Sequence, residues 1–439
     1  MKRSNFFSII FIVIFLVAPL GAQWAKSYYP KKASGSAYVK EVRQASHGGY
    51  IACGAYFSST NAYEGLIFKL DGGGILEWQN DFSGPAQDWM NSVWPARDGG
   101  YIVGGTTSSG ALILKLDALG RIEWQLSHGW YSDEILSVIQ TSDGGFAALV
   151  SAMGHPLFVK LSAFGTVQWQ FECTGPGLRV HTPATLRQTR EGGYVVAVSA
   201  GLDYSNYDVW IFKLNAQGNF EWQEMLGGPL EENVASLEQT VDGGFIFSGM
   251  TLSFGAGNHD IWVVRLTAAG DVAWQRTYGT SRWEEAHAVA QTQDGGFIVA
   301  CTLNSGYDFS LLKLQPNGDV EWGRTYGGTG GGPVLGWVTS LLETSDGGFV
   351  TACGSSDFKI LVLKIRNDGL IDADCKLAVT SVQLAAMDST AVPKATYAIP
   401  SLPQADWSVG NISLQPIELS ARLECGHESG SGKKGSIRR

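Results

Sequence analysis

The feature that most constrains this chain is a turn motif, two glycines followed by an aromatic residue, which recurs seven times at intervals of 45 to 52 residues. The first glycine of each copy is Gly48, Gly99, Gly144, Gly192, Gly243, Gly295 or Gly347. Asp or Glu precedes six of the seven copies, and an apolar run such as YIVGG or FIVAC follows. A period of this length predicts an array of one small structural unit stacked on copies of itself.

Each unit continues with a second apolar run, which ends in Lys or Arg followed by Leu or Ile. Four residues beyond that Leu or Ile stands a glycine: Gly74, Gly120, Gly165, Gly218, Gly270, Gly318 or Gly369. A last short run carries a tryptophan in six units: Trp78, Trp124, Trp169, Trp222, Trp274 and Trp322. With the run that precedes each Gly-Gly pair, a unit contains four short apolar runs separated by turns, which predicts four strands.

Four strands in a unit of this length are typical of a β-propeller blade. Asp-Gly-Gly supplies the positive φ angles of a tight hairpin, and the later glycine fits the left-handed position of a second short turn. The composition agrees, because charged residues are only 16% while the chain has 56 glycines and 15 tryptophans. We therefore predict an all-β, seven-bladed β-propeller with four antiparallel strands per blade.

The two ends of the repeat region indicate how the ring closes. The seventh unit lacks a tryptophan in its last run, at residues 368–374. The sequence WAKSYY, which begins at Trp24, matches later tryptophan runs such as WQRTYG at Trp274. We predict that this N-terminal strand becomes the outer strand of the last blade, which would leave no unpaired sheet edge inside the ring.

Residues 1–22 have the pattern of a signal peptide, with two basic residues, an apolar run and small residues before Ala22. The apolar run is short for a membrane span, so we expect cleavage and no membrane span in the mature protein; a retained anchor is the alternative. Export predicts a secreted, periplasmic or cell-surface protein. We assign residues 23–374 to the propeller, 375–427 to an appended β segment packed on the ring, and 428–439 to a disordered tail.

Five of the six cysteines divide into two kinds, and the sixth, Cys173, stands beside the tryptophan run of its unit with no evident partner in the sequence. Cys53, Cys301 and Cys353 lie in the strand after Gly-Gly, where buried core positions are expected. Cys375 and Cys425 bracket the appended segment and are candidates for a disulfide in an exported protein, worth about 4 kcal/mol in the chain-entropy model. No spacing of cysteines fits a zinc site, and we predict no metal site.

The segment KLDALGRIEW, residues 115–124, resembles the tryptophan-docking repeat of quinoprotein-like propellers, in which a tryptophan locks neighbouring blades. The Asp-Gly-Gly-Tyr/Phe element is similar to that of exported bacterial β-propeller repeat proteins. The resemblance extends from Trp24 to about Gly369 and implies the fold. Quinoprotein dehydrogenases combine adjacent cysteines with a calcium-bound cofactor in the axial funnel. This chain has no adjacent cysteines, and we expect no cofactor.

Charge and motifs exclude several classes of function. The net charge of −10 argues against nucleic acid or an anionic membrane as partner, because both attract clustered Lys and Arg. No HxxxH, HExxH or GxSxG pattern and no phosphate-binding loop occurs, and no catalytic residue is predicted.

Alternating strand direction places the two glycine turns of each unit on one face of the ring and the two variable loops on the other. Variable loops on a rigid scaffold are where recognition is usually found. The candidate binding residues are aromatic: Trp89, Trp130, Tyr131, Tyr204, Tyr207, Trp283, Tyr307 and Trp337. Acids stand near them in the same loops: Asp88, Asp133, Glu134, Glu231, Glu232, Glu284 and Glu285. This mixture suits a sugar chain or a peptide, unless the aromatics pack between blades and the acids cap loops.

The leading hypothesis is an exported, monomeric, non-enzymatic propeller that binds a protein or a glycan through its variable loops. One alternative is an enzyme, either a glycan-active hydrolase or lyase that uses converging carboxylates or a degenerate quinoprotein. Another alternative is an envelope assembly factor for which the ring is a docking platform.

Overall fold

The computed structural model describes the chain as an all-β molecule, and the described residues form strands β1 to β35 without a helix. The residues that it describes are 23–82, 87–129, 132–174, 179–201, 206–303, 308–327, 335–355, 359–371, 379–384, 386–389, 392–394, 399–401, 407–408, 415–416 and 419–425. The expected signal peptide and C-terminal tail lie outside these residues.

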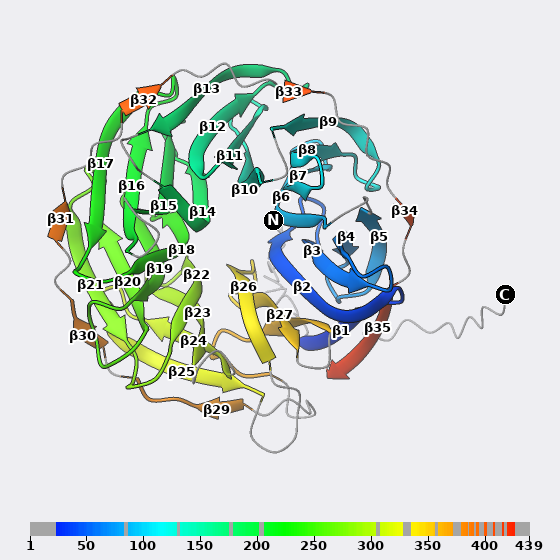
Figure 1. Cartoon of the computed structure of the whole chain (residues 1–439). Coiled ribbons are helices and arrows are strands. Elements are labelled where there is room, and N and C mark those ends of the chain that lie inside the picture. The colour runs from blue at the N-terminus through cyan, green and yellow to red at the C-terminus, as the bar shows by residue number, and fades with distance from the viewer. Residues whose placement is uncertain are drawn as a thin grey trace, which may run out of the picture.

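Seven sheets surround a common axis as the blades of a propeller (Figure 1). From the axis outward, blade 1 contains β2 (Ala33–Gln44), β3 (Tyr50–Ser58), β4 (Tyr63–Leu70) and β5 (Leu76–Phe82). Blade 2 contains β6 (Trp89–Pro95), β7 (Tyr101–Thr107), β8 (Gly110–Leu116) and β9 (Ile122–His128). Blade 3 contains β10 (Glu134–Gln140), β11 (Phe146–Ala152), β12 (His155–Leu161) and β13 (Val167–Thr174). Blade 4 contains β14 (Arg179–Gln188), β15 (Tyr194–Gly201), β16 (Asp208–Leu214) and β17 (Phe220–Gly227).

The remaining blades follow the same order. Blade 5 contains β18 (Glu232–Gln239), β19 (Phe245–Thr251), β20 (Asp260–Leu266) and β21 (Val272–Tyr278). Blade 6 contains β22 (Glu285–Gln291), β23 (Phe297–Leu303), β24 (Asp308–Leu314) and β25 (Val320–Tyr326). Blade 7 contains β26 (Leu335–Glu343), β27 (Phe349–Ser355), β28 (Ile360–Ile365) and β1 (Trp24–Pro30). The predicted fold, a seven-bladed propeller with four antiparallel strands per blade, is confirmed.

The closure of the ring also agrees with the prediction. Strand β1 pairs antiparallel with β28, with Trp24 opposite Lys364 and Tyr28 opposite Ile360. One hydrophobic cluster lies at each of the seven junctions between neighbouring blades, including the junction of blade 7 with blade 1. The core of this protein is therefore a closed circle of interblade contacts, which a chain without β1 would interrupt.

At every junction the tryptophan of an outer strand lies against the turn glycine of the next blade. The pairs are Trp24–Gly74, Trp78–Gly120, Trp124–Gly165, Trp169–Gly218, Trp222–Gly270, Trp274–Gly318 and Trp322–Gly369. Each of these glycines has a positive φ, and a Cβ placed on it would come within 2.6 to 3.1 Å of the tryptophan ring. Glycine is therefore required at these positions for two reasons, the positive φ of the backbone and the close approach of the tryptophan ring.

A second interblade contact comes from the last residue of the inner strands. Among the described residues, the side-chain oxygen of this Gln or Glu accepts a hydrogen bond from a turn N–H of the preceding blade at five junctions. The pairs are Arg97–Gln140 (2.8 Å), Ser142–Gln188 (2.7 Å), Arg190–Gln239 (2.9 Å), Val241–Gln291 (2.7 Å) and Gln293–Glu343 (3.1 Å). Blades are thus joined near the axis by these side chains and near the rim by the tryptophans.

The C-terminal segment adds a fifth strand to every blade, and we call its seven strands the C-terminal strap. They are β29 (Val379–Ser381), β30 (Ala386–Asp388), β31 (Val392–Lys394), β32 (Ile399–Ser401), β33 (Trp407–Ser408), β34 (Gln415–Pro416) and β35 (Leu419–Cys425). They pair antiparallel with the outer strands of blades 6, 5, 4, 3, 2, 1 and 7 in that order. Figure 1 shows the strap, in orange and red, running back around the rim of the ring. The outer strands of the repeats are therefore covered rather than exposed as edges.

The cysteines in the strands after Gly-Gly are core residues, as predicted. Cys53, Cys301 and Cys353 are fully buried free thiols, and burial raises the pKa of Cys353 to about 12. Cys375 lies outside the described residues, and Cys425 is the last residue of β35. The disulfide between them stays a prediction.

Candidate functional site

The two faces of the ring differ in chemistry. On the face with the glycine turns, which we call the turn face, a buried or half-buried Lys or Arg of each outer hairpin binds an acid of a nearby turn or strand. In blade 2, Lys115 Nζ lies 2.8 Å from both Asp98 and Glu123, and in blade 3 Lys160 lies 2.8 Å from Asp143. These pairs tie the two turns of a blade together and make this face regular from blade to blade.

The opposite face carries the variable loops, and we call it the loop face. Four side chains of blades 1 and 2 form an aromatic group there, namely Tyr38, Phe57, Tyr63 and Trp89. The ring centroids of Tyr63 and Trp89 are 4.2 Å apart, those of Phe57 and Tyr63 are 5.1 Å apart, and Tyr38 lies 6.0 Å from both Tyr63 and Trp89. All four are only partly buried, and the exposed Lys40 places its ammonium 5.6 Å from the Trp89 ring. The group is an amphipathic, aromatic surface of the kind that protein interfaces favour.

Trp283 is a second aromatic feature of the loop face, between blades 5 and 6. Its side chain is 44% exposed and stacks on His259 with ring centroids 3.8 Å apart. Its Nε1 donates a hydrogen bond to Glu285 Oε1 over 2.6 Å. One face of the indole is thus fixed by its neighbours, and the exposed part is held in a defined orientation.

Of the other predicted binding residues, Tyr207 is the one whose side chain the structure describes, and it does not join these two features. Tyr207 is buried, at 6% exposed, and its carbonyl accepts the N–H of Glu232 over 2.7 Å. Trp337 lies in the inner strand β26. Trp130, Tyr131, Tyr204 and Tyr307 lie outside the described residues.

Most of the acids that stand near these aromatics in the sequence are loop caps. Asp88, Asp133, Glu232 and Glu284 are each at most 2% exposed. Glu232 accepts hydrogen bonds from the Gly228 N–H at 2.6 Å and the Thr251 hydroxyl at 2.7 Å, and Glu284 accepts both the N–H and the hydroxyl of Thr280. These carboxylates hold the loops in shape and are not available to a ligand.

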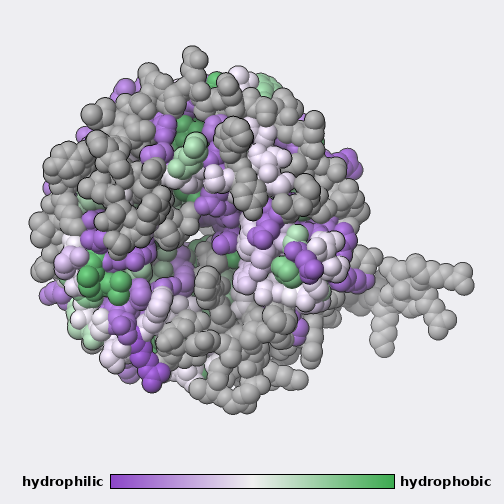
Figure 2. Space-filling model, viewed as in Figure 1, coloured by the Kyte–Doolittle hydropathy of each residue, from purple (hydrophilic) through white to green (hydrophobic). Residues whose placement is uncertain are grey.

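A second candidate site lies on the axis, where the inner strands of all seven blades surround a cavity of about 420 Å³. Figure 2 shows a hollow near the centre of the ring with hydrophilic residues around it. Small hydroxyl side chains line it at equivalent positions of five blades: Ser92, Ser137, Thr185, Ser236 and Ser340. In blade 1 the equivalent position holds Glu41.

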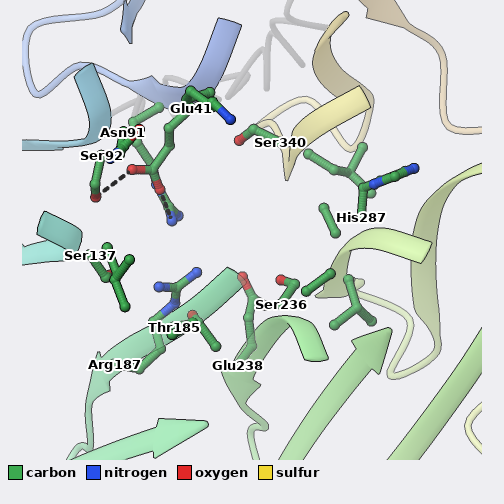
Figure 3. Close-up of a pocket in the computed structure, with 18 of the residues that line it drawn as sticks. Glu41, Asn91, Ser92, Ser137, Thr185, Arg187, Ser236, Glu238, His287 and Ser340 are labelled. Carbon is green, nitrogen blue, oxygen red and sulfur yellow. Dashed lines mark hydrogen bonds and ion pairs between the residues drawn. The ribbon is translucent and has the colours of Figure 1, made fainter. Parts of the chain in front are cut away.

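Glu41 is fully engaged by its neighbours (Figure 3). Its Oε1 accepts hydrogen bonds from Arg43 Nε at 2.7 Å and Nη2 at 2.5 Å. Its Oε2 accepts hydrogen bonds from the Ser92 hydroxyl and from the Val93 N–H, both at 2.8 Å. This carboxylate therefore joins blade 1 to blade 2 and neutralises Arg43.

Arg187 of blade 4 and Glu238 of blade 5 also point into the cavity (Figure 3). The guanidinium carbons of Arg43 and Arg187 lie 4.6 and 5.8 Å from the centroid of the Trp94 ring. Burial, and then repulsion by Arg43, lower the pKa of Arg187 to about 10. Burial raises the pKa of Glu238 against the opposing effect of Arg187 and Arg43. Both groups are held in a low-dielectric site without a close ion pair between them in the described structure.

His287 lines the same cavity from blade 6. Its Nε2 is 2.9 Å from the Thr302 hydroxyl, and burial lowers its pKa to about 4. The imidazole is therefore neutral at pH 7. At the start of β10, burial raises the pKa of Glu134, which faces the cavity near its loop-face end.

Sequence reasoning named Glu134 and Glu285 only as acids of the variable loops and missed the other charged residues of the cavity, although the repeat carries a signal for three of them. The residue just before the last position of each inner strand is apolar in blades 3, 6 and 7. In blades 1, 2, 4 and 5 the residues there are Arg43, Trp94, Arg187 and Glu238. The scaffold does not require a side chain that departs from the repeat at an axis-facing position. Such a departure therefore indicates a candidate binding site.

Comparison with known proteins supports the assignment of the fold and identifies no chemical activity. No protein-family model and no curated protein matches the sequence. Among solved structures, the chain is similar to the WD40 domain of Pan2 from Neurospora crassa, with 11% identity and a TM-score of 0.50. That match covers 77% of this chain and 95% of the WD40 domain. The described residues contain no helix that is long and apolar enough to cross a bilayer. By structure, the chain is a seven-bladed β-propeller with WD40-like neighbours.

Proposed function

We propose that this protein is an exported, monomeric, non-enzymatic scaffold that binds a protein partner through its loop face. The observation that carries the proposal is the aromatic group of Tyr38, Phe57, Tyr63 and Trp89, which is partly exposed on strands of a rigid ring, on its loop face. Large aromatic side chains beside a Lys, on a preformed surface, provide contact area at little entropic cost. The similarity to a WD40 domain supports the proposal, since propellers of that kind commonly bind proteins.

Trp283 extends the proposed surface to the opposite side of the ring. Its exposed indole is oriented by His259 and Glu285, as expected for an anchor that is pre-organised for a partner. The signal-peptide pattern of residues 1–22 supports export. The interblade tryptophan contacts support the resemblance to tryptophan-docking propellers, which concerns the scaffold and not its ligand.

The proposal is tested by capture of partners from the source cells on immobilised protein that begins at Gln23. Trp89→Ala and Trp283→Ala should each weaken binding of the captured protein at least about tenfold, as for a central aromatic residue of an interface. Phe164→Ala is the matched control, because Phe164 is 86% exposed on the turn face. Loss of binding in the Phe164 variant, or retention in both tryptophan variants, would place the interface elsewhere. If the protein binds glycans on an array and captures no protein, the proposed ligand is wrong and the ligand is a glycan.

A glycan-active hydrolase is the second candidate, and one observation favours it. Four carboxylates line the axial cavity, namely Glu41, Glu134, Glu238 and Glu285, and burial raises the pKa of Glu134 and of Glu238. A carboxyl with a raised pKa is what a glycosidase uses as general acid. Turnover of aryl glycosides that Glu134→Gln or Glu238→Gln abolishes would establish this activity, and absence of turnover across a panel of such glycosides would remove the candidate.

A further inference from the structure

One half of the axial cavity, on blades 3 to 5, carries polar groups with few or no hydrogen-bond partners among the described residues. Within the described part of the chain, the Arg187 side chain makes one hydrogen bond, from Nη1 to the Leu186 carbonyl at 2.8 Å. The hydroxyls of Ser137, Thr185 and Ser236 make none to described residues, and they line the cavity around Arg187 (Figure 3). These groups are oriented toward the same space.

The other half of the cavity is different, which makes the contrast informative. There Arg43 is neutralised by Glu41, and Ser92 donates to Glu41 while its oxygen accepts the N–H of Val138 at 3.0 Å. Ser340 donates to the Val42 carbonyl at 3.1 Å. The groups on blades 7, 1 and 2 therefore hold the ring together, whereas those on blades 3 to 5 have capacity for a ligand.

The chemistry of the free groups defines the ligand. A guanidinium with open N–H groups presents a planar fork, which matches the two oxygens of a carboxylate. The Trp94 ring lies 5.8 Å from the Arg187 guanidinium carbon, and a bound anion would relieve the repulsion between Arg187 and the nearby Arg43. Glu238 accepts one long hydrogen bond, from the Gln291 N–H at 3.3 Å, and can accept others from a donor on the ligand.

We propose that the axial cavity binds a small organic acid that also carries hydroxyl or amino groups, with its carboxylate on Arg187. Its hydroxyl or amino groups meet Glu238 and the hydroxyls of Ser137, Thr185 and Ser236. A cavity of about 420 Å³ lies within the range of small-molecule sites in proteins. The site is independent of the aromatic group on the loop face, so either proposal can fail without the other.

The test is calorimetric titration of the protein with D-glucuronate and L-glutamate, one acid with hydroxyl groups and one with an amino group. D-glucose is the uncharged counterpart of glucuronate. We expect saturable binding of at least one acid and none of D-glucose. Arg187→Gln should weaken that binding at least about tenfold, the effect of losing a charge-assisted hydrogen bond.

Arg187→Lys is the second variant, because it retains a cation beside Glu238 and removes only the planar pair of guanidinium N–H donors. This variant should also weaken binding of the acid. Arg121→Gln, an exposed arginine on the turn face, is the matched control and should bind as the parent does. Circular dichroism of each variant verifies the fold. Absence of saturable binding by both acids, equal binding of D-glucose and D-glucuronate, or unchanged affinity in the folded Arg187 variants would each overturn the proposal.

Discussion

At the scale of the residue, the contact between a tryptophan and a turn glycine is the unit that joins the blades. Gly165 has a φ of 79° and Gly144 a φ of 84°, but only Gly165 lies against a ring, that of Trp124. Both Gly→Ala changes incur the cost of a left-handed alanine, about 1–2 kcal/mol. Gly165→Ala should cost about 1–3 kcal/mol more, because its methyl group meets the indole.

The measurement is urea unfolding of the two variants in parallel. Gly144 is a suitable control because a Cβ placed on it meets nothing within 4 Å. Equal losses of unfolding free energy would mean that the tryptophan contact contributes nothing beyond the backbone conformation of its glycine.

The ion pairs of the turn face predict a dependence of stability on acid pH. Burial alone would raise the pKa of Asp143, but hydrogen bonds from Lys160, Thr141 and the Gly145 N–H lower it to about 2. Because the folded-state pKa lies below the unfolded value of about 3.9, this stabilisation is complete above that value and is lost as the pH falls through 2. The contribution of this ion pair to the free energy of unfolding is modest, since the Asp143 side chain is 54% exposed.

Urea midpoints measured between pH 7 and pH 2 test this. Asp143→Asn should be less stable than the parent at neutral pH, and the difference should shrink as the pH falls from 4 to 2. The control is Asp271→Asn, at an exposed turn position without an ion pair to a described residue. A gap between parent and Asp143→Asn that is as large at pH 2 as at pH 7 would exclude the ion pair as its source.

At the scale of the element, β1 is the strand that makes the ring continuous. It lies between β28 and β35, it buries Trp24 and Tyr28, and the Tyr28 hydroxyl donates to the Gly74 carbonyl over 2.6 Å. Deletion of residues 23–30 should lower the unfolding free energy by more than the about 3–5 kcal/mol that truncation of one buried Trp costs. Thermal unfolding of the deletion variant checks this, and an unchanged melting temperature would contradict closure by this strand.

The sequence allowed β1 to be predicted because its tryptophan and tyrosine spacing repeats that of β21 and β25, whose Tyr278 and Tyr326 hydroxyls also donate to turn glycines. The strap could not be predicted in the same way. Its strands are only two to seven residues long, pair through the backbone, and carry no repeat that matches the blades. The sequence shows the glutamines of the inner strands as a recurring Gln-Thr before the turns. Only the assembled ring shows that each side chain accepts a hydrogen bond from the neighbouring blade.

At the scale of the whole molecule, the strap protects the outer edges of the blades. A chain that ends at Lys376, before β29, would expose β25, β21, β17, β13, β9 and β5 as unpaired edges and remove β35 from β1. Exposed edges pair with other chains. The truncated protein should melt at a lower temperature and associate as its concentration rises, as light scattering after gel filtration would detect. A truncated protein that stays monodisperse with the melting temperature of the parent would show that the strap is dispensable.

The candidate sites illustrate the limit of prediction from this sequence. Trp89 and Trp283 could be selected as loop aromatics, because the repeat defines which segments are loops. Their partners could not, since Tyr38 and His259 reach them only through the packing of neighbouring strands and loops. The axial cavity combines side chains from inner strands about fifty residues apart in the chain, and no local motif records that convergence.

The central functional claim is that the loop face, and not the turn face, meets the partner. Hydrogen exchange followed by mass spectrometry, with and without the captured partner, tests it most directly. Exchange should slow in residues 57–63 and 281–285 when the partner binds. It should stay unchanged in the turns at residues 117–121 and 162–166. Slower exchange confined to those turns, with none at the loop-face segments, would contradict the claim.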